Sequence, residues 1–303
     1  MPLSIDVIVR TLADAARSEL LFRALDSIQG QTGVDARPIV VVNGQRFDPA
    51  TLAALERRPG IVLHCEQQAS AQLARAAGRR LVTAPYFAYL DDDDVLVAGS
   101  LREPLQWLED HPDCDVMINN GYFAREGQPL VRFTDIPSHV DHPALSLLDE
   151  SWLQPGAFMC RTESIPPVML GSEWSNLEWT HLAFELCAER KHLHFMDIPT
   201  VHYNDTPGSM SKEMRQHEVA LDLLQLVCRD PRLDAEVRRG AYRKFLRSLH
   251  DLAWGYWQRG QYGRAWRAHL TSLRPPYTFR YLLFSRKLMW PAGGGSRPRL
   301  PSL

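Results

Sequence analysis

The chain has 303 residues, of which 45% are hydrophobic and 23% are charged, and its formal net charge is −2. These values are ordinary for a globular protein and predict one large domain or one and a half. The near-neutral charge excludes the strong basic excess that most nucleic-acid-binding proteins carry, so no nucleic-acid partner is expected.

The first half of the chain alternates short apolar runs with segments of helical periodicity. Predicted strands cover residues 5–9, 38–42, 61–64 and 85–90, and predicted helices cover residues 19–29, 50–58 and 70–80. This alternation is typical of an α/β fold, with a mixed, mostly parallel sheet flanked by helices.

Four adjacent aspartates, Asp91 to Asp94, directly follow the fourth apolar run. Their mutual repulsion is costly unless the run is solvated or a cation neutralises it. In an open α/β sheet, ligands bind at the carboxyl ends of the strands, and carboxylate oxygens suit Mg²⁺ or Mn²⁺ shared with substrate phosphates. Taken alone, the run leaves two interpretations open, a metal-bridged phosphate ester or a solvated acidic turn.

Cysteine usage and hydropathy favour a cytoplasmic protein. The five cysteines have no CxxC spacing, which indicates neither a disulfide framework nor a zinc ribbon. Residues 1–6 run straight into a strand-like segment, so no signal peptide is expected, and no stretch reaches the ~18 apolar residues of a spanning helix. The cysteines are Cys65, Cys114, Cys160, Cys187 and Cys228.

Five motifs in the first half occur in a recognisable order. They are Val-Ile-Val-Arg-Thr at 7–11, Arg-Ala-Leu-Asp-Ser-Ile at 23–28 with Gln-Thr at 31–32, Val-Val-Val-Asn-Gly at 40–44, Ala-Arg-Ala-Ala-Gly at 74–78, and Tyr-Leu-Asp-Asp-Asp-Asp at 89–94. In this order and spacing they resemble the family 2 glycosyltransferases of the GT-A fold, inverting enzymes that use a nucleotide-diphosphate sugar. Two positions depart from that family, because Asn43 stands where an aspartate is common and Arg10 where a proline is frequent.

The resemblance implies a role for each residue of the donor site. Asp91 and Asp93 would hold Mg²⁺ or Mn²⁺ against the diphosphate of the donor, and Asp92 would contact the ribose or the sugar. Thr11, Asn43 and Arg75 would hold the nucleoside. His202 would reach the metal or the diphosphate, although a lone histidine is also common as an ordinary strand residue.

The general base is expected at the start of a helix predicted from residue 175 onward. Aligning the helix with the family places Glu178 and Trp179 on its usual Glu-Asp pair, which makes Glu178 the candidate base. Glu173 and Asp149 are the other candidates. Ser175-x-x-Glu178 also matches a capping box, which would give Glu178 a purely structural role.

The chain is predicted to divide into a GT-A domain at residues 1–212, a helical region at 213–290 and a disordered tail at 291–303. Residues 126–143 read as a loop or hairpin and residues 204–211 as a lid. Residues 274–290 combine aromatic and basic side chains, so the helix there is expected either to contact the inner face of the membrane or to dock on its own domain.

The expected function is sugar transfer from a nucleotide-diphosphate donor to a saccharide or lipid-linked saccharide, in cell-surface polysaccharide or lipopolysaccharide synthesis. One alternative is a non-catalytic nucleotide-sugar-binding or scaffold protein, suggested by Trp179 and Asn43. The weaker alternative is a nucleotidyltransferase, which would need a glycine-rich phosphate loop, and residues 10–17 contain no glycine.

Overall fold

A computed structural model of the chain describes residues 3–125, 128–134, 136–171, 174, 176–204, 215–275 and 279–289. By its contacts the chain divides into two compact units, Met1–Lys212 and Glu213–Leu303. The disordered tail predicted at 291–303 and most of the lid lie outside the described residues.

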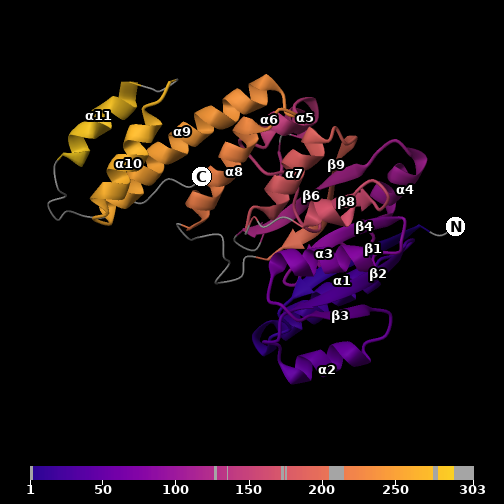
Figure 1. The fold of residues 1–303 in the computed structure, drawn as a ribbon. Coiled ribbons are helices and arrows are strands. Elements are labelled where there is room, and N and C mark those ends of the chain that lie inside the picture. The colour runs from indigo at the N-terminus through magenta and orange to yellow at the C-terminus, as the bar shows by residue number, and fades with distance from the viewer. Residues whose placement is uncertain are drawn as a thin grey trace. The chain divides into compact units, whose positions relative to one another are not determined.

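The first unit is built on a mixed sheet with the strand order β3-β2-β1-β4-β8-β6-β9-β5, in which β7 pairs with β6 (Figure 1). Parallel ladders join β1 to β2 and β4, β2 to β3, and β6 to β9. The predicted fold class is therefore confirmed. The strands are β1 (Ser4–Thr11), β2 (Asp35–Asn43), β3 (Val62–Glu66), β4 (Tyr86–Asp91), β5 (Val95–Leu96), β6 (Val116–Arg125), β7 (Gln128–Val131), β8 (Phe158–Arg161) and β9 (Leu193–Tyr203).

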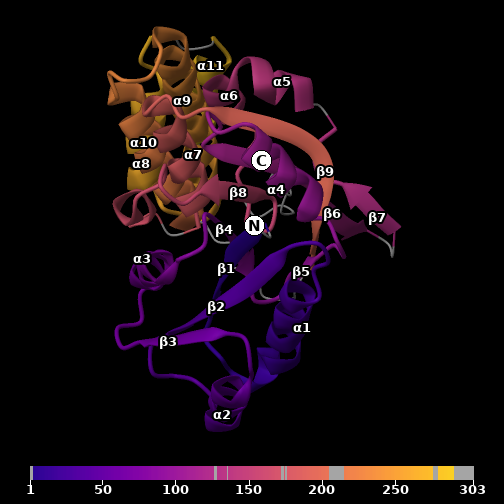
Figure 2. The same ribbon diagram turned by 90° about the vertical axis from the view of Figure 1, so that its right-hand side faces the viewer.

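Helices cover both faces of the parallel half of this sheet, and Figure 2 shows α1 and α3 on opposite sides of β1 and β2. The segment predicted as a loop or hairpin contains β7, which pairs with β6, and then a short helix, α5. The helices of this unit are η1 (Ala15–Arg17), α1 (Ser18–Gln29), α2 (Pro49–Arg57), α3 (Ala71–Leu81), α4 (Arg102–Asp110), α5 (Ile136–Asp141), α6 (Pro143–Ser146), η2 (Pro167–Leu170) and α7 (Glu178–Ala188).

The core lies between α1 and the central strands, where Leu21, Leu25 and Ile28 pack with strand residues such as Val9 and Val40. All five are at most 1% exposed. Each fully buried aliphatic side chain contributes about 1.5–3 kcal/mol relative to an exposed one. This burial on both faces explains why β1 and β2 are continuously apolar in sequence.

Asp6 is a buried charge inside β1 and is fully partnered. Its carboxylate accepts hydrogen bonds from Arg37 at 2.8 and 2.9 Å, and from the backbone N–H groups of Thr83 at 2.8 Å and Ala84 at 3.0 Å. A buried charge is tolerated only with such partners. Asp6 therefore ties β2 and the entry to β4 onto β1, and this fixes the order of the three strands.

Helix α3 approaches β1 unusually closely at Gly78. A Cβ atom on Gly78 would lie 2.5 Å from Cγ2 of Ile8 and 3.3 Å from Cγ2 of Val41. Only glycine allows the helix backbone to lie this near the sheet. The contact fixes the position of Arg75, one turn earlier on the same helix.

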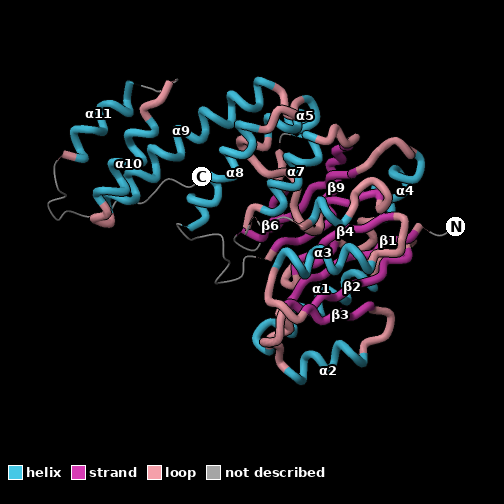
Figure 3. Tube along the Cα trace, viewed as in Figure 1, coloured by secondary structure: helices cyan, strands magenta, loops and turns pink. Residues whose placement is uncertain are grey.

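The described residues of the second unit form helices joined by short turns (Figure 3). The turn at residues 259–261 confirms the predicted helix-turn-helix connection. None of the described helices has the length and hydropathy that crossing a membrane requires. The helices are α8 (Arg215–Arg229), α9 (Ala235–Gln258), α10 (Tyr262–Ser272) and α11 (Phe279–Leu288).

Acidification is expected to destabilise this second unit through His269. The ring is fully buried, its Nε2 lies 2.8 Å from the Ser285 hydroxyl, and it faces His250 with a ring-centre distance of 6.1 Å. Burial lowers the pKa of His269 below its ordinary value of 6.5. The unfolded chain therefore takes up a proton first, so stability is full above about pH 6.5 and falls as the pH drops below that value.

Thermal melts at pH 7.5, 6.5 and 5.5 would measure this effect, with a slope of at most about 1.4 kcal/mol per pH unit from one group. His269→Gln should flatten the dependence, whereas His142→Gln, an exposed histidine of the first unit, should leave it unchanged. Equal slopes in the wild type and in His269→Gln would assign the titration to another group.

Candidate active site

The carboxyl ends of β1, β2 and β4 bring the predicted donor-site residues to one edge of the sheet. The parallel registers place Arg10 beside Asp91, Thr11 beside Val42, and Asn43 beside Glu66. This is the edge at which ligands bind in open α/β sheets. The structure therefore places Thr11, Asn43 and the start of the acidic run together, as the sequence predicted.

The acidic run is largely buried rather than a solvated turn. Burial raises the pKa of Asp91 to about 6, Arg10 opposes the shift, and Asp93 and Asp92 add to it. Burial also raises the pKa of Asp94 to about 8, with a further contribution from Asp91. Desolvated carboxylates crowded in this way make the edge of the sheet favourable for a cation.

One protein cation already lies in the run. Arg17, on the short helix η1, places Nη2 2.5 Å from Oδ1 of Asp92 and 2.9 Å from Oδ2 of Asp93. The Thr11 hydroxyl also bonds to Asp92. Asp14 holds η1 in place by accepting a hydrogen bond from the Arg17 backbone N–H at 2.9 Å.

The far side of the run is held by Asn204, the first residue of the predicted lid and the only lid residue that the structure describes. Its backbone N–H donates to Oδ1 of Asp94 at 2.9 Å, and its side-chain amide donates to the carbonyl oxygen of Asp93. The start of the lid is thus bonded directly to the acidic run. A change in the run's position would be transmitted to residue 204.

Asn43 has a structural partner at the nucleoside end of the site. Its Oδ1 accepts a hydrogen bond of 2.9 Å from the backbone N–H of Ser70, the residue that caps α3. Because the oxygen accepts from this N–H, the amide NH₂ is the group that Asn43 can offer to a base. The next residue, Gly44, turns the chain away with a φ of +87°.

Glu178 forms the centre of a buried ion-pair cluster. Its Oε1 lies 3.0 Å from Nη1 of Arg75 and 3.7 Å from Nη1 of Arg10. Its Oε2 is buried and has no hydrogen-bond partner among the described residues. Burial lowers the pKa of Arg75 from its usual value, an effect that Glu178 opposes. Two arginines thus fix the carboxylate in one position.

The capping-box interpretation of Glu178 is wrong. Helix α7 begins at Glu178 itself with Leu177 as its N-cap, and no side chain caps it. Glu178 is therefore the first residue of the helix, and its carboxylate pairs with Arg75 instead of closing a box. Ser175 and Glu173, the second candidate base, lie outside the described residues, and Asp149 is exposed.

Trp179 anchors the start of α7 to the sheet. Its ring centre lies 4.9 Å from that of Tyr89 on β4 and 5.4 Å from that of Phe158 on β8. The Tyr89 hydroxyl in turn donates to the carbonyl oxygen of Arg75 at 3.0 Å. Trp179 therefore packs beneath the helix end that carries Glu178, at the position where the family usually has an acid.

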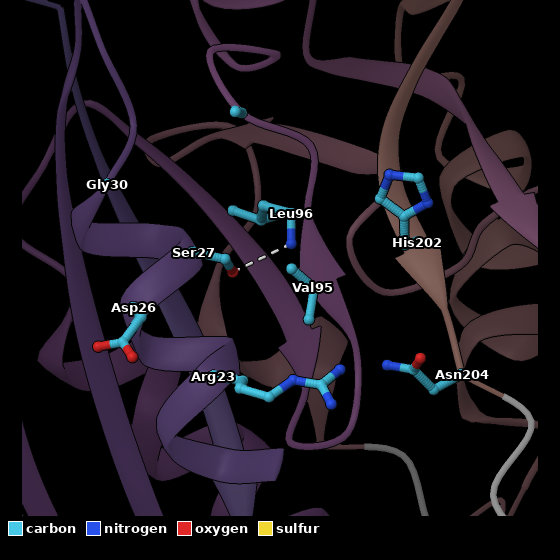
Figure 4. A pocket seen from close by; sticks show the side chains of 9 residues that line it. Arg23, Asp26, Ser27, Gly30, Val95, Leu96, His202 and Asn204 are labelled. Atoms are coloured by element: carbon cyan, nitrogen blue, oxygen red, sulfur yellow. Dashed lines mark hydrogen bonds between the residues drawn. The ribbon is translucent and has the colours of Figure 1, made fainter. Parts of the chain in front are cut away.

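His202 lies on an exposed part of β9, where its ring stacks on Tyr122 at a centre distance of 5.1 Å. It lines a cavity of about 570 Å³ between α1 and the β5–β9 pair (Figure 4). Of the predicted site residues only His202 lines this cavity. The lining residues are Arg23, Asp26, Ser27, Gly30, Val95, Leu96, Ala98, His202 and Asn204.

The acids fit a divalent cation that is shared with a substrate. The Arg17 nitrogen between Asp92 and Asp93 shows that the run already binds one cation, next to the acid pair Asp91 and Asp93 proposed for the metal. Within the described residues, no group of three His, Cys, Asp or Glu side chains could hold a metal without further ligands. Mg²⁺ commonly takes one or two carboxylates and completes its shell with substrate phosphates and water.

Sequence reasoning missed Arg17 and Asn204, and it left Arg10 undecided. Asp14 caps the helix that carries Arg17, but nothing in the sequence showed where the arginine side chain would lie. The contact of Arg10 with Glu178 joins residues far apart in the chain and required the fold.

Comparison with known proteins agrees with this geometry. The structure is similar to crystal structures of S. aureus TarS 1-349, with a TM-score of 0.56 and 13% identity over 81% of this chain and 71% of that chain. A complex of TarS with UDP-GlcNAc gives 0.56 and 15%, covering 82% and 72%, and a complex with UDP gives 0.54 and 13%, covering 82% and 71%. At these identities the likeness shows the fold.

No curated protein sequence matches the chain. The family model described as glycosyl transferase family 2 matches residues 7–162, which is half of the chain and includes every motif on which the resemblance rested. The chain belongs to glycosyl transferase family 2.

Proposed function

We propose that the chain transfers a sugar from a nucleotide-diphosphate donor to an acceptor hydroxyl with inversion at the anomeric carbon. The observation that carries the proposal is the placement of Thr11, Asn43 and the acidic run at one sheet edge in a family 2 glycosyltransferase. The similarity to TarS structures that contain UDP-GlcNAc and UDP supports a nucleotide-sugar donor.

Each side chain of the site has a proposed task. Thr11, Asn43 and Arg75 hold the nucleoside, and Asp92 contacts the ribose or the sugar. A Mg²⁺ or Mn²⁺ ion held by Asp91 and Asp93 would stabilise the negative charge that develops on the leaving diphosphate. His202 reaches the metal or the diphosphate.

Glu178 is the proposed general base. It takes the proton of the acceptor hydroxyl as that oxygen attacks the anomeric carbon. Arg75 and Arg10 hold Oε1, so Oε2 receives the proton. Two ion pairs hold the carboxylate in one orientation, which keeps it positioned for proton transfer.

The experiment that tests the function is thermal stabilisation by UDP, GDP, dTDP and CDP, each with Mn²⁺ or with EDTA. One nucleotide is expected to raise the melting temperature by roughly 5–10 °C at a hundredfold excess over its Kd, in Mn²⁺ only. Release of that nucleotide from its sugar donor, with the product anomer read by NMR, would then establish transfer and inversion. No stabilisation by any nucleotide would contradict the proposal.

A non-catalytic nucleotide-sugar-binding protein is the second candidate. Trp179 stands where the family usually has an acid, and Glu178 is engaged by two arginines, which favours this alternative. Metal-dependent nucleotide binding without transfer or donor hydrolysis would support it. The family match leaves no support for a nucleotidyltransferase.

The acceptor is proposed to be a saccharide or lipid-linked saccharide of the cell surface, used from the cytoplasmic side of the membrane. The last 52 residues, 252–303, hold nine arginine and lysine residues and no aspartate or glutamate, so a charge of +9 there balances −11 in the rest of the chain. Helix α11 also exposes Phe279 and Leu283, at 73% and 51%. Basic and apolar side chains on one helix suit an anionic bilayer.

The full chain is therefore expected to sediment with vesicles that contain about 30% anionic phospholipid and to remain in solution with neutral vesicles. High salt should release it, because each basic residue near the surface contributes about 1 kcal/mol only while unscreened. Leu283→Glu should weaken sedimentation, whereas Val168→Glu, which alters an apolar residue of the first unit that is 82% exposed, should not. Equal binding to neutral vesicles would exclude the electrostatic contact.

A further inference from the structure

Arg17 binds Asp93, one of the two acids proposed to hold the metal, and joins it to Asp92. Its Nη2 bridges Oδ1 of Asp92 at 2.5 Å and Oδ2 of Asp93 at 2.9 Å. The two acids are 12% and 19% exposed in their side chains, whereas Arg17 is 39% exposed. The arginine thus caps two mostly buried carboxylates from the solvent side and can leave without unfolding its surroundings.

Arg17 binds the two carboxylates through only one nitrogen of its guanidinium group, Nη2. One nitrogen makes both contacts, and the Nε–H is buried without a hydrogen-bond partner among the described residues. A guanidinium binds best through two parallel N–H groups on one phosphate or carboxylate. The contact with the acids therefore leaves Arg17 with an unused donor on its edge.

A metal and Arg17 cannot both hold the same carboxylate oxygens. A divalent cation at Asp93 would meet the guanidinium within a few ångströms, and the two positive charges would repel each other. A metal held by Asp91 and Asp93 is therefore expected to displace Arg17 from Asp93. The displaced cation then needs a new anionic partner, and the donor's diphosphate is the anion that arrives with the metal.

We infer that Arg17 is an internal counter-cation that keeps metal alone out of the acidic run and passes to the diphosphate when metal and donor bind together. This inference rests on the proposed function and adds to it the order of events at the same site. Arg17 opposes the metal in the empty protein and binds phosphate in the loaded one. Metal and diphosphate consequently bind with strong mutual enhancement.

The test measures free Mn²⁺ by electron paramagnetic resonance, with and without inorganic pyrophosphate, which supplies the two phosphates without a base. Arg17→Gln is expected to bind Mn²⁺ alone about tenfold more tightly than the wild type, and pyrophosphate should enhance its Mn²⁺ affinity about tenfold less, a size typical of coupling between two ligands. Arg17→Lys retains a cation and should leave the affinity for Mn²⁺ alone weak. Arg80→Gln, which removes the same charge from an exposed position on α3, should behave as the wild type.

An unchanged or weaker affinity of Arg17→Gln for Mn²⁺ alone would overturn the inference and leave the proposed function intact, provided that the wild type binds Mn²⁺ with pyrophosphate. Failure of every variant to bind Mn²⁺, even with pyrophosphate, would instead contradict the metal-dependent function on which the inference rests. Melting temperatures of the variants show whether the fold is retained. We expect η1 to persist in them, because its Asp14 cap uses the backbone N–H of residue 17 and not the substituted side chain.

Discussion

Glu178→Gln is expected to lower kcat by about 10²–10⁴-fold while donor binding changes little. Glutamine has the size of glutamate and retains an oxygen that can accept from Arg75, but it cannot take a proton from the acceptor. Alanine would be a poorer test, because it would break the buried ion pair between Arg75 and Glu178 and cost roughly 3–5 kcal/mol of stability. The measurement is the initial rate of nucleotide release at saturating donor, together with the thermal shift by nucleotide and Mn²⁺.

The matched control for this prediction is Asp149→Asn. Asp149 is the exposed alternative candidate for the base, and its substitution should leave kcat within a small factor. A large loss of rate in Asp149→Asn with an unaffected Glu178→Gln would transfer the role to Asp149. Loss of nucleotide binding in Glu178→Gln would indicate that Glu178 acts by orienting Arg75 for the nucleoside.

Asp93→Asn is expected to abolish the metal-dependent thermal shift and to reduce transfer by roughly 10³-fold. Asp93→Asn weakens the hold on the metal, and losing one group that stabilises a developing anion typically costs a factor of 10²–10³. Asp93 also holds Arg17 at 2.9 Å. The melting temperature without ligand should change little, because asparagine can still accept from Arg17. Nucleotide titrations in Mn²⁺ and in EDTA measure the loss.

Asp113→Asn is the control for this second prediction, because Asp113 is exposed at the end of α4 and its substitution changes the net charge equally. If Asp93→Asn shows the same Mn²⁺-dependent thermal shift as the wild type, the metal is held by other residues. A shift that persists unchanged in EDTA for the wild-type protein would argue that the arginines alone neutralise the diphosphate.

The sequence predicted the parallel half of the sheet well because β1, β2 and β4 are largely buried on both faces and their centres read as apolar runs. The resemblance assigned Thr11, Asn43 and Asp91 to one donor site. The structure places them at one edge, because each ends a strand and parallel strands end together. The β6–β7 hairpin and α5 were harder to foresee. Their segment is short and carries little periodicity, so local pattern could not separate a loop from small elements.

The electrostatics of the site required the fold. Glu178 was identified by its place at a helix start, but the local Ser-x-x-Glu pattern suggested a cap, whereas the observed partners are Arg75 and Arg10. Arg17 is separated from Asp92 by 75 positions in the chain. Ion pairs between such distant residues leave no periodic or spacing signal in a single sequence.

The reach of Arg75 depends on a residue that has no side chain. Gly78 lets α3 lie against Ile8 where a Cβ would come within 2.5 Å, and Arg75 extends toward Glu178 from this closely seated helix. The tolerance of the site to mutation therefore depends partly on the packing of Gly78 against Ile8, outside the site itself. Even alanine at position 78 would push α3 away from Ile8 and move Arg75 away from Glu178. The evolution of new donor specificity in this protein is therefore limited by the packing of α3 on β1 as well as by the residues that contact the donor.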